Sequence, residues 1–193
     1  MPLTGPVLIS TQNSSPTVMM HMLSLLIVAP AALCASLIRR DAQSVYDDIT
    51  GIDLAVRNLT ATLLAYNGGI LESRPTFSAS IAVHAVNRQG FADATASSPF
   101  SAADSKRIVD HVNDSVGVSI PESVQVLESK KPLFDTAEVS SLIKATVDLL
   151  KSDHETFSAA VGTKLSVDQV APGLAAAGKI DAVLQEASLY YTA

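Results

Sequence analysis

The chain has 193 residues, with 13 Lys and Arg against 19 Asp and Glu, a net charge of −6, one cysteine and no tryptophan. Its length is typical of one ordinary domain, and its negative charge excludes the clustered basic surface that nucleic-acid binding requires. A single cysteine excludes an intramolecular disulfide, and the scarcity of aromatic residues favours helices built from small side chains over a β-sandwich.

An apolar segment, MLSLLIVAPAALCA at residues 22–35, comes before the region of regular periodicity. It is shorter than the ~20 residues of a membrane-spanning helix and ends in the small residues that a signal peptidase reads. We therefore expect residues 1–35 to comprise an N-terminal extension and a cleaved secretory signal peptide, with Ala35 at the cleavage point. The alternative is a buried first helix of the domain, which Pro30 would interrupt.

Arg39 and Arg40 follow this segment directly. One interpretation is that a dibasic-cutting protease of the secretory route removes residues 36–40 as a propeptide; the other is an ordinary exposed charge pair. The first interpretation leaves residues 41–193 as the mature domain, beginning at Asp41 and free of cysteine.

The strongest periodic signal predicts a first helix from Asp41 to the Asn67-Gly68-Gly69 turn. Its apolar positions alternate steps of four and three residues and share one face: Val45, Ile49, Ile52, Val56, Leu59, Leu63 and Tyr66. A weaker apolar face, made of Phe77, Ile81, His84, Ala85 and Phe91, predicts a second helix over about 77–96.

Three further helices are predicted in the second half of the chain. Ser101 can cap a third helix whose apolar positions run from Ile108 to Ile120, and Pro121 is expected to bend or end it before a short segment resumes to Lys130. The spacing predicts a fourth helix over roughly 135–163 and a fifth that opens after SVDQVAPG, with apolar positions from Ala176 to Tyr190. We therefore expect an all-α fold: a single antiparallel bundle of about five amphipathic helices after a cleaved signal peptide.

Two sequons, at Asn58 and Asn113, match the pattern for N-glycosylation. Neither asparagine lies on the apolar face of its helix, so both are expected to face water. If the chain is secreted, they are candidate glycan sites.

Catalytic and metal-binding motifs such as G-x-S-x-G and H-E-x-x-H do not occur in the chain. The pairs Asp110-His111 and Asp153-His154 are adjacent in sequence, and helix neighbours point about 100° apart, so neither makes a dyad. We expect no enzyme, no cofactor and no metal, with a site assembled across helices as the open alternative. His154 falls on an apolar face, either as a core histidine bonded to a neighbour or as a polar group that bonds a ligand carboxylate.

The segments RRDAQSVYDDITGIDLAVRNLTATLLAYNGG and SKKPLFDTAEVSSLIKATVDLLKSDHETFSAAV give the chain a family resemblance. It resembles the fungal hydrophobic surface binding protein A family, also described as cell wall galactomannoproteins, over about residues 41–190. The resemblance rests on the order of the helices, an initial I..ID.AV..L rhythm and the Gly-Gly turn. It implies a secreted, mannosylated five-helix bundle that adsorbs to hydrophobic surfaces or shelters a fatty-acid chain, and in some members recruits a secreted polyester-degrading esterase.

The leading hypothesis is a secreted or cell-wall-associated, non-enzymatic protein that binds a hydrophobic surface or a fatty-acid-like lipid in an apolar cavity between helices. Small side chains with few aromatics to fill space can leave such a cavity. The expected wall consists of Ile52, Val56, Leu63, Val112, Val116, Ile143, Val147, His154 and Phe157. The alternative is a structural or antigenic wall mannoprotein that acts through its glycans and outer surface.

Overall fold

The computed structural model describes the backbone of residues 29–192 and the side chains of residues 42–192. Within this range the regular elements are all helices: α2 (Ala29–Ala65), α3 (Arg74–Ala96), α4 (Ala102–Asp114), α5 (Val116–Ser129), α6 (Lys131–Thr136), α7 (Ser140–Gly162) and α8 (Val167–Tyr190). The chain divides into two units, residues 1–37 and 38–193, and the helical bundle belongs to the second. The prediction of an all-α class is confirmed.

The predicted signal segment begins at Met22, outside the described residues. Its end and the residues Ala35, Arg39 and Arg40 fall in the first part of α2, where only the backbone is described. The helix therefore begins before the predicted start at Asp41. No helix in the described part of the chain is long and apolar enough to span a membrane.

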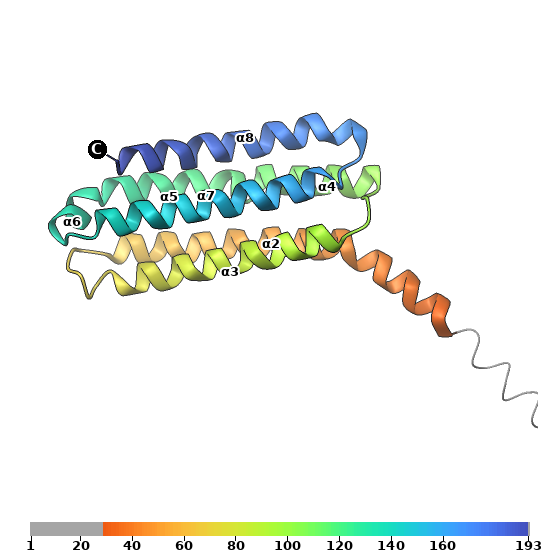
Figure 1. The fold of residues 1–193 in the computed structure, drawn as a ribbon, viewed down its shortest axis with the longest axis horizontal. Coiled ribbons are helices and arrows are strands. Elements are labelled where there is room, and N and C mark those ends of the chain that lie inside the picture. Colours follow the sequence, from red (N-terminus) through yellow and green to blue (C-terminus); the bar gives the residue numbers. More distant parts are fainter. Residues whose placement is uncertain (1–28, 193) are drawn as a thin grey trace, which may run out of the picture. The chain divides into compact units, whose positions relative to one another are not determined.

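Consecutive long helices run in opposite directions, as Figure 1 shows. α7 packs against both α3 and α8, and α8 packs against α4 and α5. α4 and α5 follow one another along one line, so together they take the place of the single third helix that the sequence predicts. The predicted antiparallel bundle is confirmed.

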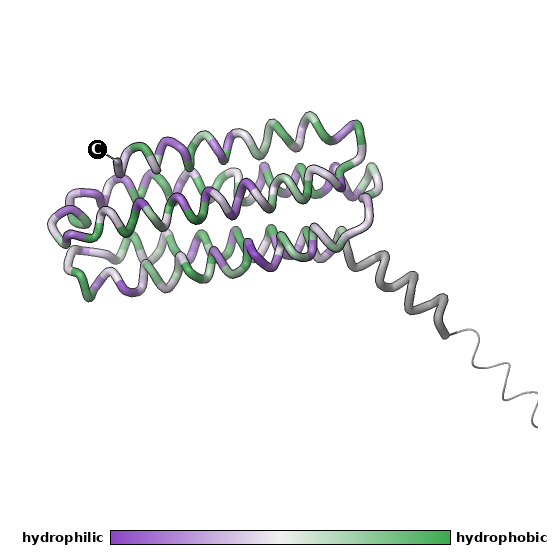
Figure 2. Tube along the Cα trace, in the orientation of Figure 1, coloured by the Kyte–Doolittle hydropathy of each residue, from purple (hydrophilic) through white to green (hydrophobic). Residues whose placement is uncertain are grey.

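The predicted apolar face of α2 is buried, with Leu59 packed at its edge and the other six side chains inside the core. Burial of this face at roughly 25 cal/mol per Å² is the main force that holds α2 in the bundle. Figure 2 shows the same alternation of hydrophobic and hydrophilic positions along each helix. The turn after the helix contains Gly68 and Gly69, with φ of 102° and 97°, a conformation that favours glycine.

The predicted face of α3 is wrong in part, because Ile81 is 66 % exposed and Ala85 also faces water. The buried positions are Thr76, Ala79, Ser80, Val83, Asn87, Gly90 and Ala94. Polar residues can lie on this face because they bond to their own helix: Ser80 donates to the carbonyl of Phe77 at 2.8 Å, and Asn87 to that of Val83 at 3.0 Å. Phe77, His84 and Phe91 are only half-buried.

The third predicted helix breaks at Ser115, whereas Pro121 was expected to break it. The Ser115 hydroxyl donates to the carbonyl of His111, and its φ and ψ of −117° and −92° stop α4. A Cβ on Gly117 would lie 2.9 Å from the carbonyl oxygen of Val112, so glycine permits the close approach at this break. Pro121 becomes the sixth residue of the new helix, where its missing N–H removes one hydrogen bond.

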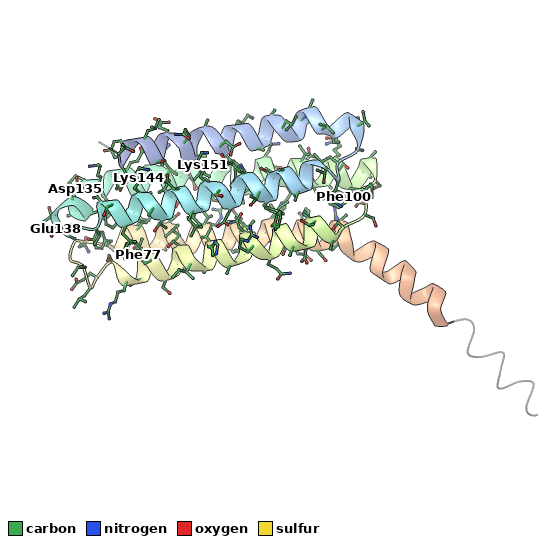
Figure 3. All side chains as sticks on the ribbon, viewed as in Figure 1. Phe77, Phe100, Asp135, Glu138, Lys144 and Lys151 are labelled. Carbon is green, nitrogen blue, oxygen red and sulfur yellow. The ribbon has the colours of Figure 1, made fainter. Side chains whose placement is uncertain are left out.

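The start of each of the last two long helices also differs from the prediction. α7 begins at Ser140 instead of about 135, because Glu138 has a φ of +59° and separates the short α6 from it; Figure 3 shows Asp135 and Glu138 at this turn. α8 begins at Val167, seven residues before the predicted start at Leu174, with Ser166 at its N-cap. Its Pro172 is the sixth residue of the helix, as Pro121 is in α5. As predicted, Ser101 caps α4 by accepting from the backbone N–H of Asp104.

Candidate ligand-binding cavity

A cavity of about 130 Å³ lies in the centre of the bundle, between α2, α3, α4, α5, α7 and α8. Its wall is almost entirely apolar. It includes six residues of the predicted wall: Ile52, Val56, Val112, Val116, His154 and Phe157. Because these side chains come from α2, α4, α5 and α7, the cavity depends on the assembled bundle and not on any one helix.

A smaller cavity of about 40 Å³ lies between α2, α3, α5 and α7. The other three residues of the predicted wall, Leu63, Ile143 and Val147, line this second space. The predicted wall residues therefore surround two cavities and not one.

Small side chains of α8 leave the central cavity unfilled on one side. Gly173, Ala176 and Ala177 face it from this helix, and Leu174 lines it while remaining 66 % exposed. Leu174 is therefore in contact with both the cavity and solvent. The predicted wall leaves out this contribution of α8, although Ala176 lies on the apolar face of the predicted fifth helix.

Polar residues in the cavity wall were also missed. Asn87, Ser123 and Ser158 line the central cavity alongside His154. Asn87 and Ser158 satisfy their polar groups on their own helices, by donating to the carbonyls of Val83 and Glu155. Apolar periodicity gives no signal for such residues, because their hydrogen bonds are local and their hydropathy is that of surface positions.

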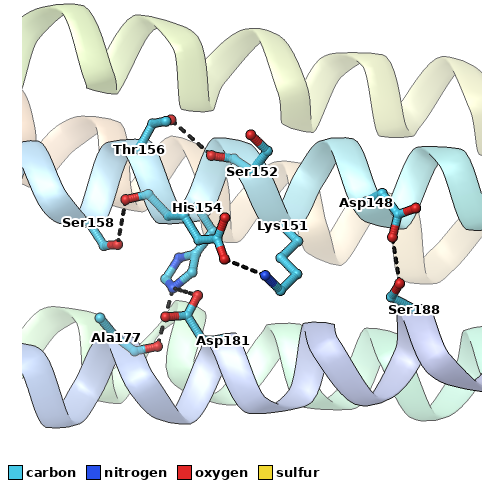
Figure 4. A network of polar contacts seen from close by, with 10 residues as sticks. Asp148, Lys151, Ser152, His154, Thr156, Ser158, Ala177, Asp181 and Ser188 are labelled. Atoms are coloured by element: carbon cyan, nitrogen blue, oxygen red, sulfur yellow. Dashed lines mark hydrogen bonds and ion pairs between the residues drawn. The ribbon is translucent and has the colours of Figure 1, made fainter.

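His154 contributes an imidazole ring to the wall of the central cavity, and Figure 4 shows its polar contacts. Its Nε2 lies 3.2 Å from the carbonyl oxygen of Ala177 and 3.3 Å from Oδ1 of Asp181, both on α8. Burial lowers the pKa of His154 below its ordinary value, against the opposing effect of the Asp181 carboxylate. A neutral imidazole with its proton on Nε2 donates to Ala177, which is the arrangement of a core histidine bonded to a neighbour.

The two Asp-His sequence pairs do not act together in the structure. Asp153 is buried and its Oδ2 lies 2.6 Å from Nδ1 of His84, across the contact between α7 and α3. His111 stacks on Tyr46 with ring centroids 3.9 Å apart, and its Nε2 lies 2.8 Å from the hydroxyl of Thr50. Each histidine joins two helices, and among residues 42–192 no group of three or more His, Cys, Asp or Glu side chains could hold a metal ion.

The two sequon asparagines are both exposed, Asn58 on α2 and Asn113 near the end of α4. Asn113 Nδ2 donates to the carbonyl of Val109 at 3.0 Å, within its own helix. The predicted exposure is therefore confirmed at both positions.

The fold and the cavity place the chain among helical bundles that enclose an apolar interior space. The sequence model of the family described as hydrophobic surface binding protein A matches residues 42–163. The chain belongs to this family, and the resemblance seen in the sequence is confirmed. Comparison with curated protein sequences finds no match.

Solved structures with the same fold contain fatty acids. AfMP4p, in complex with palmitic acid, is 24% identical over 78% of this chain and 99% of its own, with a TM-score of 0.75. Ligand-binding domain 1 of Penicillium marneffei MP1, complexed with arachidonic acids, is 19% identical over 78% and 98% of the two chains, with a TM-score of 0.74. Domain 2 of the same protein, also with arachidonic acids, is 18% identical over 79% and 94%, with a TM-score of 0.71.

Proposed function

We propose that this protein is a non-enzymatic carrier that binds the acyl chain of a fatty acid in the central cavity. The observation that carries the proposal is the apolar cavity itself, and we infer that its opening lies beside Leu174, which lines it and is 66 % exposed. The fatty acids in AfMP4p and in the MP1 domains support it, because those proteins share this fold. Transfer of an acyl chain from water into such a space is favourable by about 0.8 kcal/mol per CH₂.

The size of the cavity implies that the bundle expands around its ligand. Its volume of about 130 Å³ is close to the ~150 Å³ of an engineered protein cavity that holds benzene. Pockets for larger molecules measure about 300–1,000 Å³. A long acyl chain must therefore push side chains or helices outward, and the small side chains of α8 beside the opening offer least resistance.

The carboxylate of the ligand stays at the opening, in contact with water. Inside the cavity the Nε2 of His154 is occupied by the Ala177 carbonyl and faces the Asp181 carboxylate. A second carboxylate at this point would meet like charge and lose its hydration. His154 accordingly serves as part of the wall and holds α7 to α8.

A fatty-acid titration of the delipidated protein tests this function. Ala176→Phe places a ring in the cavity, and Ala175→Phe adds the same ring to the exposed side of α8. We expect Ala176→Phe to weaken palmitic-acid binding at least tenfold and Ala175→Phe to leave it unchanged. Circular dichroism of both variants checks the fold. Absent binding in the parent, or equal affinity in the two variants, overturns the proposal.

A histidine variant tests the position of the carboxylate. His154→Gln keeps a donor for the Ala177 carbonyl, so we expect palmitic-acid affinity to change less than threefold. A loss of tenfold or more would place the carboxylate at His154.

Secretion and glycosylation form the cellular part of the proposal. The apolar segment at residues 22–35 acts as a signal peptide, cleavage follows near Ala35 or at Arg39-Arg40, and glycans attach at Asn58 and Asn113, which are exposed. Expression in a secreting fungal host, N-terminal sequencing of the product and its mass before and after enzymatic deglycosylation test these points. An intracellular product of unprocessed mass contradicts them.

A further inference from the structure

The two cavities of the bundle lie end to end along its long axis. On α7 the small cavity extends from Ile143 to Leu150, and the central cavity extends from Leu150 to Gly162. On α2, which runs antiparallel to α7, the central cavity comes first, between Ile49 and Leu59, and the small cavity follows, between Leu59 and Leu63. Because both helices change from one cavity to the other at a single residue, the cavities meet at one level of the bundle.

Three residues belong to the walls of both cavities: Leu59 on α2, Ser123 on α5 and Leu150 on α7. The boundary between the cavities therefore lies at these three residues, one on each of three helices. Leu59 and Leu150 are half-buried residues at the edge of the core. A leucine changes between staggered rotamers without moving its helix, so this partition can open.

The central cavity alone and the two cavities together extend over different lengths of the bundle, which correspond to different acyl chains. Leu150 and Gly162 are twelve residues apart on α7, which at 1.5 Å per residue gives about 18 Å for the central cavity. One acyl chain of a bilayer covers half of a hydrocarbon core of ~30 Å, or about 15 Å. From Ile143 to Gly162 the distance is about 28 Å, so joining the two cavities gives a longer path along which the bundle can expand around a longer chain.

We propose that Leu59, Ser123 and Leu150 form a partition that sets the acyl chain length that this protein accepts. The proposal rests on the proposed function, since it concerns the same cavity. A chain that fills the central cavity ends against the two leucines. A longer chain binds with added affinity only when it displaces them and enters the small cavity beside Val147.

A series of saturated acids, from decanoic to behenic acid, tests the partition by titration of the delipidated protein. In the parent we expect affinity to rise by about fourfold per added CH₂ and then to level off at the length that fills the central cavity. Leu150→Ala should remove the partition and continue the rise to longer acids. The matched control is Leu149→Ala, the exposed neighbour on the same helix, which should keep the parent profile.

Two further variants separate the partition from a general loosening of the core. Leu59→Ala opens the same boundary from α2 and should extend the profile even if Leu150→Ala does not fold. Val147→Trp fills the small cavity, so adding it to Leu150→Ala should restore the parent limit. If the parent binds no acid, the proposed function itself fails. If the parent binds and the Leu150→Ala and Leu59→Ala variants that fold level off at the parental length, the partition is wrong.

Discussion

Gly90 lies where α3 passes close to both α2 and α7. A Cβ at this position would be 3.0 Å from Cζ of Phe157 and 3.2 Å from Cβ of Asp48. Gly90→Ala must therefore displace an aromatic ring of the core. We expect a net loss of about 1–2 kcal/mol in the free energy of unfolding, even though alanine favours a helix interior by ~1 kcal/mol. Urea denaturation measures this change.

Gly178 is the matched control for this substitution, because it is also inside a helix but a Cβ there would have no atom within 4 Å. Gly178→Ala should stabilise the protein by about 0.5–1 kcal/mol. If both substitutions shift the urea midpoint in the same direction, the close contact of Gly90 with Phe157 and Asp48 does not destabilise an alanine at position 90.

Asp48 is a second residue that lowers the stability of the folded protein at neutral pH. Burial, and then the nearby carboxylate of Asp93, raise its pKa from 3.8 to about 6. When neutral, Asp48 can donate to Asp93. The folded state therefore holds this proton more tightly than the unfolded state, and the resulting stability is present below about pH 4 and lost as the pH rises through about 6.

Asp48→Asn should remove this loss of stability. We expect the variant to be more stable than the parent at pH 7 by about 1 kcal/mol, a value reduced for solvent screening because the group is only partly buried. The gain should disappear below about pH 4. Thermal unfolding across this pH range is the measurement, and Asp47→Asn, at the exposed neighbour, controls for the change in net charge. An equal gain in both variants would mean that general charge repulsion is responsible.

At the scale of helices, two lysines bind the C-terminal ends of other helices. Lys130 donates from Nζ to the carbonyls of Leu64 at 3.1 Å and Tyr66 at 2.7 Å, where α2 ends. Lys164 donates to the carbonyls of Thr95 at 3.2 Å and Ser97 at 2.6 Å, where α3 ends. Each ammonium satisfies carbonyls that have no partner within the helix and lies at the negative end of its dipole.

Replacing either lysine by methionine keeps most of the length of the side chain and removes the donor. We expect Lys130→Met and Lys164→Met each to lower the free energy of unfolding by about 1–2 kcal/mol. Lys106→Met, which removes only the exposed ion pair with Asp110, should cost less than about 0.5 kcal/mol. Equal effects in all three variants would show that the caps add nothing beyond a surface charge.

The helices that the sequence predicts best are those whose inward face is apolar throughout. The face of α2 from Val45 to Tyr66 is of this kind, and its glycine stop is unambiguous. α3 could not be predicted as well, because its buried face includes Ser80, Asn87 and Gly90, which resemble surface or turn residues. Pro121 suggested a helix end, and the fifth helix was expected to open only after the segment that contains Pro172. Each proline lies past the first turn of a helix that begins earlier, so its effect depends on where that helix starts.

The candidate cavity shows the same limit. The apolar faces predict which side chains point inward, so Val56 and Phe157 were identified as wall residues. Whether the interior forms one space or two depends on the side chains of Leu59 and Leu150, which are set by packing in three dimensions. No period in the sequence carries that information.

At the scale of the whole molecule, residues 38–193 form one unit whose first buried side chain, among those described, is Val45. A chain beginning at Asp41 should therefore keep the full stability of the bundle. A chain beginning at Thr50 loses the burial of Val45 and Ile49, which should cost about 3–6 kcal/mol. Urea denaturation of the two truncated proteins checks this. If the chain that begins at Asp41 is less stable than the complete chain, residues before Asp41 also contribute to the stability of the bundle.

Ligand binding should also stabilise the whole bundle, because an acyl chain fills space that the side chains leave empty. A ligand that binds only the folded state adds about 2.7 kcal/mol at one hundred times its Kd, which for a domain of this size raises the Tm by about 5–10 °C. Calorimetry of the delipidated protein with palmitic acid, kept below its aggregation threshold, measures the shift. Ala176→Phe, whose ring occupies the cavity, should show little of it. A shift of the same size in that variant would indicate that palmitic acid adsorbs to the outer surface, because filling the cavity would then make no difference.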